Sequence, residues 1–162
     1  MPVIFPMKWI RFFGNFEGRI TRKTFWLANV AVFVIEVIAA AIAAAVVEEF
    51  AGESAAGLTT KVLIFVFLYP SFVIALKRAH DCDIPNAIIY GYYVLLTAYQ
   101  LIIFGGRAWV IPDPSVFSLR PLFVIVFKLI VGVISLVMIV VLGFRRGTQG
   151  PNRYGPDPLE KT

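Results

Sequence analysis

The sequence predicts an all-α membrane protein with four transmembrane helices, and three observations support this prediction. Four long apolar runs, at residues 24–47, 58–76, 87–104 and 121–143, come close to or exceed the roughly 20 residues that a helix needs to cross a bilayer. Charged residues make up 15% of the chain, whereas a typical soluble domain has about 25%. The runs do not alternate strictly between apolar and polar residues, as the strands of a membrane barrel do.

We interpret residues 1–162 as a single membrane domain, in which residues 144–162 form a cytoplasmic tail rich in Pro and Gly. Such a composition is typical of extended, turn-rich structure. Before the first run, residues 4–16 carry aromatic residues at helical spacing, with Lys8 and Arg11 on the other face. This pattern predicts a short N-terminal amphipathic helix that lies in the membrane interface.

Each apolar run has its own local signals. Thr21 or Thr24 can cap the first helix, because Thr is a favoured N-cap residue. The acidic residues Glu48–Glu53 predict an exposed loop between the first and second helices. Tyrosines open the third run, where aromatic residues suit a membrane interface, and a long connection precedes the fourth run.

Basic residues are distributed unevenly between the connections. Three lie toward the other side: Lys61 at the start of the second run, and Arg107 and Arg120 between the third and fourth runs. Eleven of the 15 lie before the first run, between the second and third, or after the fourth: Lys8, Arg11, Arg19, Arg22, Lys23, Lys77, Arg78, Arg145, Arg146, Arg153 and Lys161. By the positive-inside rule, both termini are expected in the cytoplasm. The net charge of +5 is therefore attributed to topology, and no nucleic-acid partner is expected.

Three polar segments stand out against this apolar background: Gly18–Thr24, Lys77–Asp83 and Gly150–Pro158. All three are predicted on the cytoplasmic face, where the short connections of a helical bundle come together. Arginines from the three segments would then surround Asp81 and Asp157. The rigid donor fork of Arg suits carboxylates and phosphates.

The same three segments resemble the bacterial inner-membrane proteins catalogued as domain of unknown function 805. The resemblance rests on Phe16, Gly18, Arg19, Arg22, Phe25 and Trp26, then Arg78-Ala79-His80-Asp81, then Gly150, Asn152-Arg153-Tyr154-Gly155 and Asp157-Pro158. Order and spacing agree over residues 16–158. The resemblance implies a small multi-span protein of the bacterial inner (plasma) membrane, from a family without an established general activity.

The candidate site is a cytoplasmic polar cluster of nine residues: Arg19, Arg22, Arg78, His80, Asp81, Asn152, Arg153, Tyr154 and Asp157. In the leading interpretation, Asp81 pairs with Arg78, Arg19 or Arg153 and holds the helix ends and the tail together. A second interpretation is an anionic ligand, above all a lipid headgroup, bound among the arginines.

Catalysis and metal binding are weaker interpretations of the cluster. His80 and Asp81 are adjacent, and adjacent residues on a helix do not face each other. His80 and Cys82 provide too few ligands for a closed zinc site. We therefore expect no catalytic residue, no metal and no cofactor.

Two ionisable residues, Glu36 and Lys128, lie within the apolar runs at similar predicted depth. Charges inside a membrane are costly and usually paired or functional, so the sequence predicts that these two interact. In the alternative, Lys128 extends to the outer surface, while Glu36 is protonated or meets a polar neighbour such as Gln100.

The leading functional hypothesis is a structural or interaction protein. It would engage lipid headgroups, a partner membrane protein or further copies of itself. The first alternative is a small oligomeric transporter or channel-like protein that uses Glu36 and Lys128. A weaker alternative is a membrane enzyme acting on a lipid substrate at His80 and Asp81.

Overall fold

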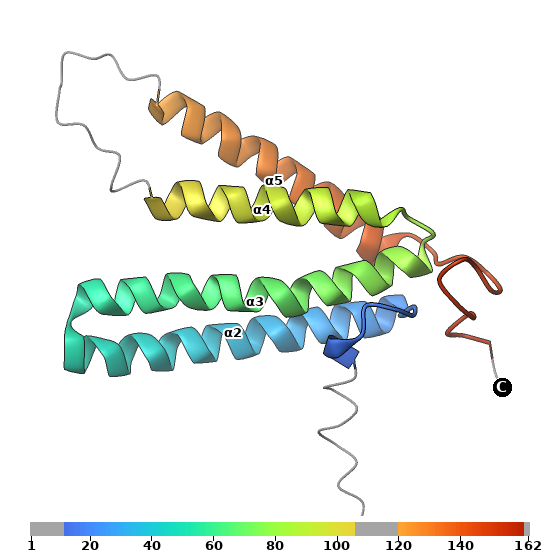
Figure 1. The fold of residues 1–162 in the computed structure, drawn as a ribbon, viewed down its shortest axis with the longest axis horizontal. Helices are drawn as coiled ribbons and strands as arrows, with labels where there is room; N and C mark the ends of the chain where they lie inside the picture. The colour runs from blue at the N-terminus through green and yellow to red at the C-terminus, as the bar shows by residue number, and fades with distance from the viewer. Residues whose placement is uncertain (1–11, 106–119, 161–162) are drawn as a thin grey trace, which may run out of the picture.

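The structure is a computed structural model that describes residues 12–105 and 120–160. Within these ranges it is helical, without strands, which confirms the all-α prediction. The long helices, labelled as in Figure 1, are α2 (Arg22–Ala51), α3 (Glu53–Asp81), α4 (Asn86–Gly105) and α5 (Arg120–Phe144). Most of the helix predicted over residues 4–16 lies outside the described residues. Residues 12–14 are helical, but residues 15 and 16 are not.

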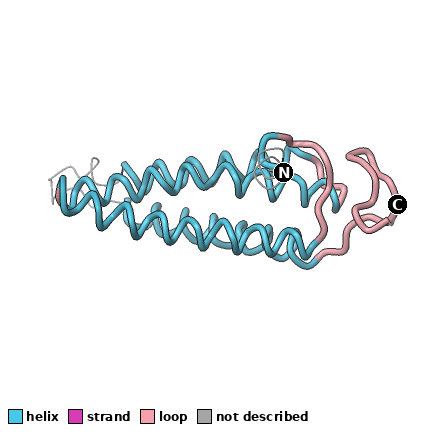
Figure 2. Tube along the Cα trace, turned by 90° about the horizontal axis from the view of Figure 1, so that it is seen from below, coloured by secondary structure: helices cyan, strands magenta, loops and turns pink. Residues whose placement is uncertain are grey.

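The helices form an elongated bundle in which α2 and α3 run antiparallel and side by side (Figure 1). Helix α4 returns next to α3, and α5 crosses α4 obliquely. The start of α2, the end of α3, the start of α4 and the end of α5 meet at one end, together with residues 145–160 (Figures 1 and 2). We call this the polar end of the bundle.

The turn between α2 and α3, at the opposite end, is a single residue. Gly52 has φ +81° and ψ 170° and accepts hydrogen bonds from the backbone N–H of Ala55 and Ala56. Only glycine adopts this backbone conformation readily. The predicted loop over Glu48–Glu53 is therefore wrong, because α2 continues to Ala51 and α3 starts at Glu53. The acidic side chains are exposed to solvent from within the helices.

The end of α3 also differs from the prediction. The segment Lys77–Asp83 was expected in a connection, yet α3 continues to Asp81. The helix ends in a Schellman motif, in which Ile84 N–H donates to Ala79 O at 2.9 Å and Asp83 N–H donates to His80 O at 3.2 Å. Asp83 takes the left-handed conformation, with φ 55°. Lys77, Arg78 and Asp81 can remain in the helix because residues of other segments bind their side chains.

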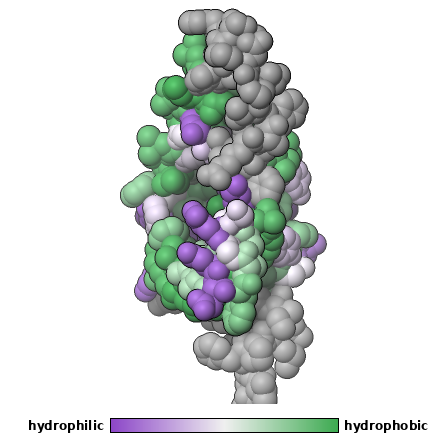
Figure 3. All heavy atoms as spheres, turned by 90° about the vertical axis from the view of Figure 1, so that its left-hand side faces the viewer, coloured by the Kyte–Doolittle hydropathy of each residue, from purple (hydrophilic) through white to green (hydrophobic). Residues whose placement is uncertain are grey.

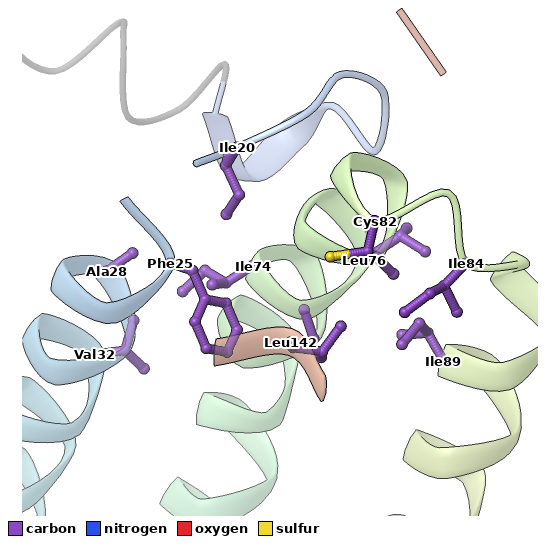
Figure 4. Close-up of a cluster of buried hydrophobic side chains, with 12 residues drawn as sticks. Ile20, Phe25, Ala28, Val32, Ile74, Leu76, Cys82, Ile84, Ile89 and Leu142 are labelled. Carbon is purple, nitrogen blue, oxygen red and sulfur yellow. The ribbon is translucent and has the colours of Figure 1, made fainter. Parts of the chain in front are cut away.

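The hydrophobic core lies near the polar end and not at the middle of the bundle (Figure 4). Phe25 of α2 lies beside Ile74 of α3 and Leu142 of α5, whereas Leu76 of α3 lies toward Ile84 and Ile89. Ile20, Ile84 and Ile89 close the core toward the connections. This packing fixes the backbone positions from which the polar side chains extend.

Away from the polar end, the helices expose large apolar side chains. Phe33 is 63% exposed, Ile42 60% and Leu129 64%. Such extended apolar surface is unusual in a soluble monomer and indicates contact with lipid or another protein. Figure 3 shows the end opposite the polar end, where hydrophilic residues are framed by hydrophobic surface.

Three helices in the described part of the chain are long and apolar enough to cross a membrane: Arg22–Ala51, Glu53–Asp81 and Leu122–Phe144. The sequence predicted four spans. Helix α4, which has 20 residues, is not among the three. The observed helices extend beyond the predicted runs at both ends.

Helices α2 and α5 meet where the indole ring of Trp26 covers Gly143. Trp26 Nε1 donates a hydrogen bond to Gly143 O at 3.2 Å. A Cβ atom built on Gly143 would lie 2.5 Å from Cζ2 of Trp26. The close approach of the two helices therefore requires glycine at this position.

We predict that Gly143→Ala lowers the unfolding temperature of the protein purified in detergent. The added methyl group overpacks the α2–α5 contact, which typically costs about 1–3 kcal/mol. Gly132→Ala in the same helix is the matched control, because a Cβ there meets nothing within 4 Å. Equal unfolding temperatures for the two variants would contradict the described contact.

Candidate functional site: an ion cluster at the polar end

Three segments far apart in the sequence meet at the polar end: residues 18–22, 77–86 and 142–157. Backbone hydrogen bonds join them directly. Ile20 N–H donates to Lys77 O at 3.4 Å, and Thr148 N–H donates to Asp81 O at 2.8 Å. The segments that the sequence analysis singled out therefore lie side by side.

The carboxylate of Asp81 lies between two guanidinium groups. Its Oδ1 is 3.1 Å from Nη2 of Arg19, and its Oδ2 accepts a hydrogen bond from Nη1 of Arg78. The three side chains are 6%, 1% and 0% exposed, in the order Asp81, Arg19, Arg78. We call these three residues the ion cluster. Charges buried this deeply must be paired and hydrogen-bonded.

Arg78 connects α3 to two other segments. Its Nε donates to Leu142 O at 2.7 Å, its Nη2 to Arg145 O at 2.5 Å, and its Nη1 to Ile20 O at 3.3 Å as well as to Asp81. The planar guanidinium holds these donors in a fixed geometry, which an ammonium group cannot reproduce. One side chain therefore ties α3 to the end of α5 and to the segment before α2.

The last carbonyl groups of α5 are capped by side chains from other helices. Arg78 binds Leu142 O, Trp26 binds Gly143 O, and Nη1 of Arg22 donates to Phe144 O at 3.4 Å. A helix end leaves these carbonyls without intrahelical partners and carries partial negative charge. Two of the three donors are cationic, so they satisfy the carbonyls and compensate the helix dipole.

Arg19 organises the C-terminal segment. Its Nη1 donates to Gly150 O at 2.8 Å and Gly155 O at 3.3 Å, and its Nη2 donates to Thr148 O at 2.6 Å. Asn152 and Gly155 exchange backbone hydrogen bonds and close the turn that presents these oxygens. The tail is thus folded around one buried guanidinium.

His80 is buried, with both ring nitrogens engaged by the protein. Nδ1 donates to Gly18 O at 3.1 Å, and Nε2 lies 2.8 Å from Oδ1 of Asn86. The ring stacks on Tyr154, with centroids 4.0 Å apart and planes 9° apart. Tyr154 also donates from its hydroxyl to Ile84 O at 3.2 Å. Neither nitrogen of His80 is therefore open to a substrate.

Asn152 Nδ2 joins the tail to α3 by donating to His80 O at 2.9 Å. Arg153 pairs with Asp83 instead of Asp81, at 2.9 Å between Nε and Oδ1, and both side chains are about half exposed. Asp157 accepts hydrogen bonds from the backbone N–H of Leu159 and of Gly150, and these bonds lower the pKa of its carboxyl. Among the described residues Asp157 forms no ion pair, although the charge of Arg19 also lowers its pKa.

Gly147 packs directly against the ion cluster, and sequence reasoning missed it. A Cβ atom on this residue would lie 2.6 Å from Cγ of Asp81. The backbone oxygens that bind the two arginines were also missed. Their identity carries no signal in the sequence, because every residue offers a carbonyl group.

The cluster offers no metal centre in the part of the chain that the structure describes, since no group of three or more His, Cys, Asp or Glu residues is placed to hold an ion there. Cys82 is 1% exposed, and burial raises the pKa of its thiol. The thiol is therefore in its unreactive, protonated form at neutral pH.

A groove of about 460 Å³ lies between α3 and α4, away from the ion cluster. Its lining is aromatic and aliphatic, with Phe72, Tyr93 and Leu101 among the residues. The groove contains almost no polar surface and no charged side chain that could act as acid or base.

The structure does not bring Glu36 and Lys128 together. No ion pair or hydrogen bond joins them in the described residues, and Lys128 is exposed on α5. Helix α2 and the first half of α5 lie on opposite sides of the molecule (Figure 1). Two residues at the same predicted depth in the membrane need not be in contact, because their helices need not be neighbours.

The fold is all-helical in the described residues, and three of its helices are long and apolar enough to suggest a membrane protein. The chain belongs to the family described as protein of unknown function (DUF805), whose sequence profile matches residues 13–156. This match confirms the resemblance noted in the sequence and includes all three segments of the polar end except residue 157. No curated protein and no solved structure matches the chain.

We predict that Asp81→Asn strongly destabilises the protein. The substitution leaves two buried guanidiniums without a counter-charge, and breaking a buried pair costs about 3–5 kcal/mol. The measurement is thermal unfolding in detergent.

Asp83→Asn is the matched control for Asp81→Asn. It removes the same charge two residues away, from a pair that is exposed, and exposed pairs contribute at most about 1 kcal/mol. Similar unfolding temperatures for the two variants would show that the buried pair does not stabilise the fold.

Proposed function

We propose that this chain is a four-span integral protein of the bacterial inner (plasma) membrane, with α2, α3, α4 and α5 as spans and both termini in the cytoplasm. At 1.5 Å per residue, the 20 residues of α4 extend roughly 30 Å, the thickness of a hydrocarbon core. Helix α4 starts at the polar end, and α5 finishes there. This arrangement supports a crossing by α4 between them.

Charge at the two ends of the bundle supports the same orientation. The exposed cations Arg22, Lys23, Arg145 and Arg146 lie at the polar end, whereas the exposed carboxylates Glu48, Glu49 and Glu53 flank the turn at the opposite end. The positive-inside rule assigns the basic end to the cytoplasm.

Within this topology, we propose a structural and interaction role for the protein. The observation that carries this proposal is Arg78, which is fully buried and donates to Asp81 and to three backbone carbonyls on two other segments. In the described residues, every buried side-chain nitrogen and oxygen has a hydrogen-bond partner. The cluster is therefore suited to holding helix ends together, so that the bundle can present its outer surfaces to lipid headgroups or a partner membrane protein.

The two alternative functions have no comparable support. A transporter that uses Glu36 and Lys128 requires these residues to share a pathway, and they lie on separate helices without contact. A membrane enzyme at His80 and Asp81 requires a free acid or base, and both side chains are engaged within the protein.

We predict that single cysteines at the far end of the bundle react with a membrane-impermeant maleimide in intact cells. Cys82 is first replaced by Ser, and the probes are Ser54→Cys after the α2–α3 turn, Arg107→Cys after α4, and Gln149→Cys in the tail. The first two should be labelled before lysis and the third only afterwards. An Arg107→Cys probe that is protected until lysis would refute the crossing by α4.

We predict that Arg78→Lys lowers the unfolding temperature and exposes the tail after residue 147 to protease, because Lys keeps the charge but loses the donor fork. Arg146→Lys is the matched control, since this exposed side chain makes no ion pair among the described residues. An Arg78→Lys protein with a wild-type unfolding temperature and a protected tail would contradict the structural role.

A further inference from the structure

A second group of cations at the polar end differs from the ion cluster in being exposed. It consists of Arg22 and Lys23 in the first turn of α2 and Arg145 and Arg146 just after α5. The two helix ends are in contact, because Arg22 binds Phe144 O and Trp26 binds Gly143 O. We call these four residues the basic rim.

The basic rim has no carboxylate partner in the described residues. The ion pairs there are Arg19–Asp81, Arg78–Asp81 and Arg153–Asp83, and they include none of the four rim residues. Four like charges on two touching helix ends repel one another unless an anion lies among them. The neighbouring Arg153, by contrast, already has its counter-charge.

Aromatic and aliphatic surface lies next to the basic rim on its apolar side. Trp26 is one helical turn beyond Arg22, and its ring contacts Phe144 edge-on, with centroids 5.6 Å apart. Trp26 is 38% exposed and Phe144 63%. Exposed apolar residues follow on both helices, including Leu27 and Val140. A ligand that fits this surface has an anionic head and a long apolar body.

We propose that the basic rim binds the phosphate group of an anionic phospholipid, with an acyl chain along Trp26, Phe144 and the apolar faces of α2 and α5. This inference rests on the proposed membrane topology and names the lipid class and the residues that bind it. The arginines of the ion cluster do not take part, because they are buried and already bonded. A zwitterionic lipid fits less well, since its ammonium group offsets the phosphate charge.

The test is a lipid titration followed by native mass spectrometry of the full chain in a non-ionic detergent. Phosphatidylglycerol and phosphatidylcholine with identical acyl chains are compared. The double variant Lys23→Gln with Arg146→Gln removes two rim charges without removing a side-chain hydrogen bond described in the structure. We expect its affinity for phosphatidylglycerol to fall by roughly tenfold to thirtyfold, while the affinity for phosphatidylcholine stays the same.

Arg153→Glu is the matched control, because it lowers the net charge by the same two units at the same end of the bundle. It should keep wild-type lipid selectivity. Unchanged phosphatidylglycerol binding in the rim variant, at a wild-type unfolding temperature, would overturn the proposal. An equal loss in the control would overturn it as well, because net charge alone would then explain the binding.

A competition experiment distinguishes binding of a membrane lipid from binding of a soluble phosphate compound. Glycerol phosphate, which carries the headgroup chemistry without acyl chains, is added as a competitor. We expect no displacement of phosphatidylglycerol at millimolar concentration, and full displacement would refute a lipid site. The cysteine labelling tests the topology independently, so failure of the basic rim and failure of the four-span proposal are distinguishable.

Discussion

The position of the Asp81 carboxylate between two buried guanidiniums is the constraint on which the polar end depends. One carboxylate cannot satisfy two arginines, so the remaining N–H groups need oxygen atoms from elsewhere. Six backbone carbonyls supply them, on Ile20, Leu142, Arg145, Thr148, Gly150 and Gly155. The requirement to satisfy buried donors thus brings the segment before α2, the end of α5 and the tail to the end of α3.

Helix ends contribute to the charge balance of the same region. The ion cluster carries two positive charges and one negative charge, and both α3 and α5 direct their C-terminal, partly negative ends toward it. The hydrophobic core of Figure 4 lies directly beside these charges and excludes water from them. Packing, dipoles and ion pairs therefore stabilise the same end of the bundle, while the opposite halves of the helices remain open to their surroundings.

The helical class and the four long helices were predictable, because an apolar run of about 20 residues indicates a helix that can cross a bilayer. The prediction failed at the end of α3, where Lys77 and Arg78 resemble a solvent-exposed connection. The carbonyl oxygens that bind the buried guanidinium of Arg78 belong to residues up to 67 positions away. Because every residue has a backbone carbonyl, the sequence does not indicate which of them will be partners. Of the three partners expected for Asp81, Arg78 and Arg19 pair with it. Arg153 pairs instead with Asp83, in the left-handed turn that ends α3.

The sequence separations within the ion cluster also set an order of assembly. Arg78 and Asp81 are three residues apart, so they can pair as soon as α3 has formed. The bond from Arg19 to Thr148 spans 129 residues and requires α5 and the segment beyond it. Arg19 therefore reaches its carbonyl partners only after residues 148–155 have been synthesised. Burial of Arg19 accordingly reports that the segment beyond α5 has folded onto the segment before α2.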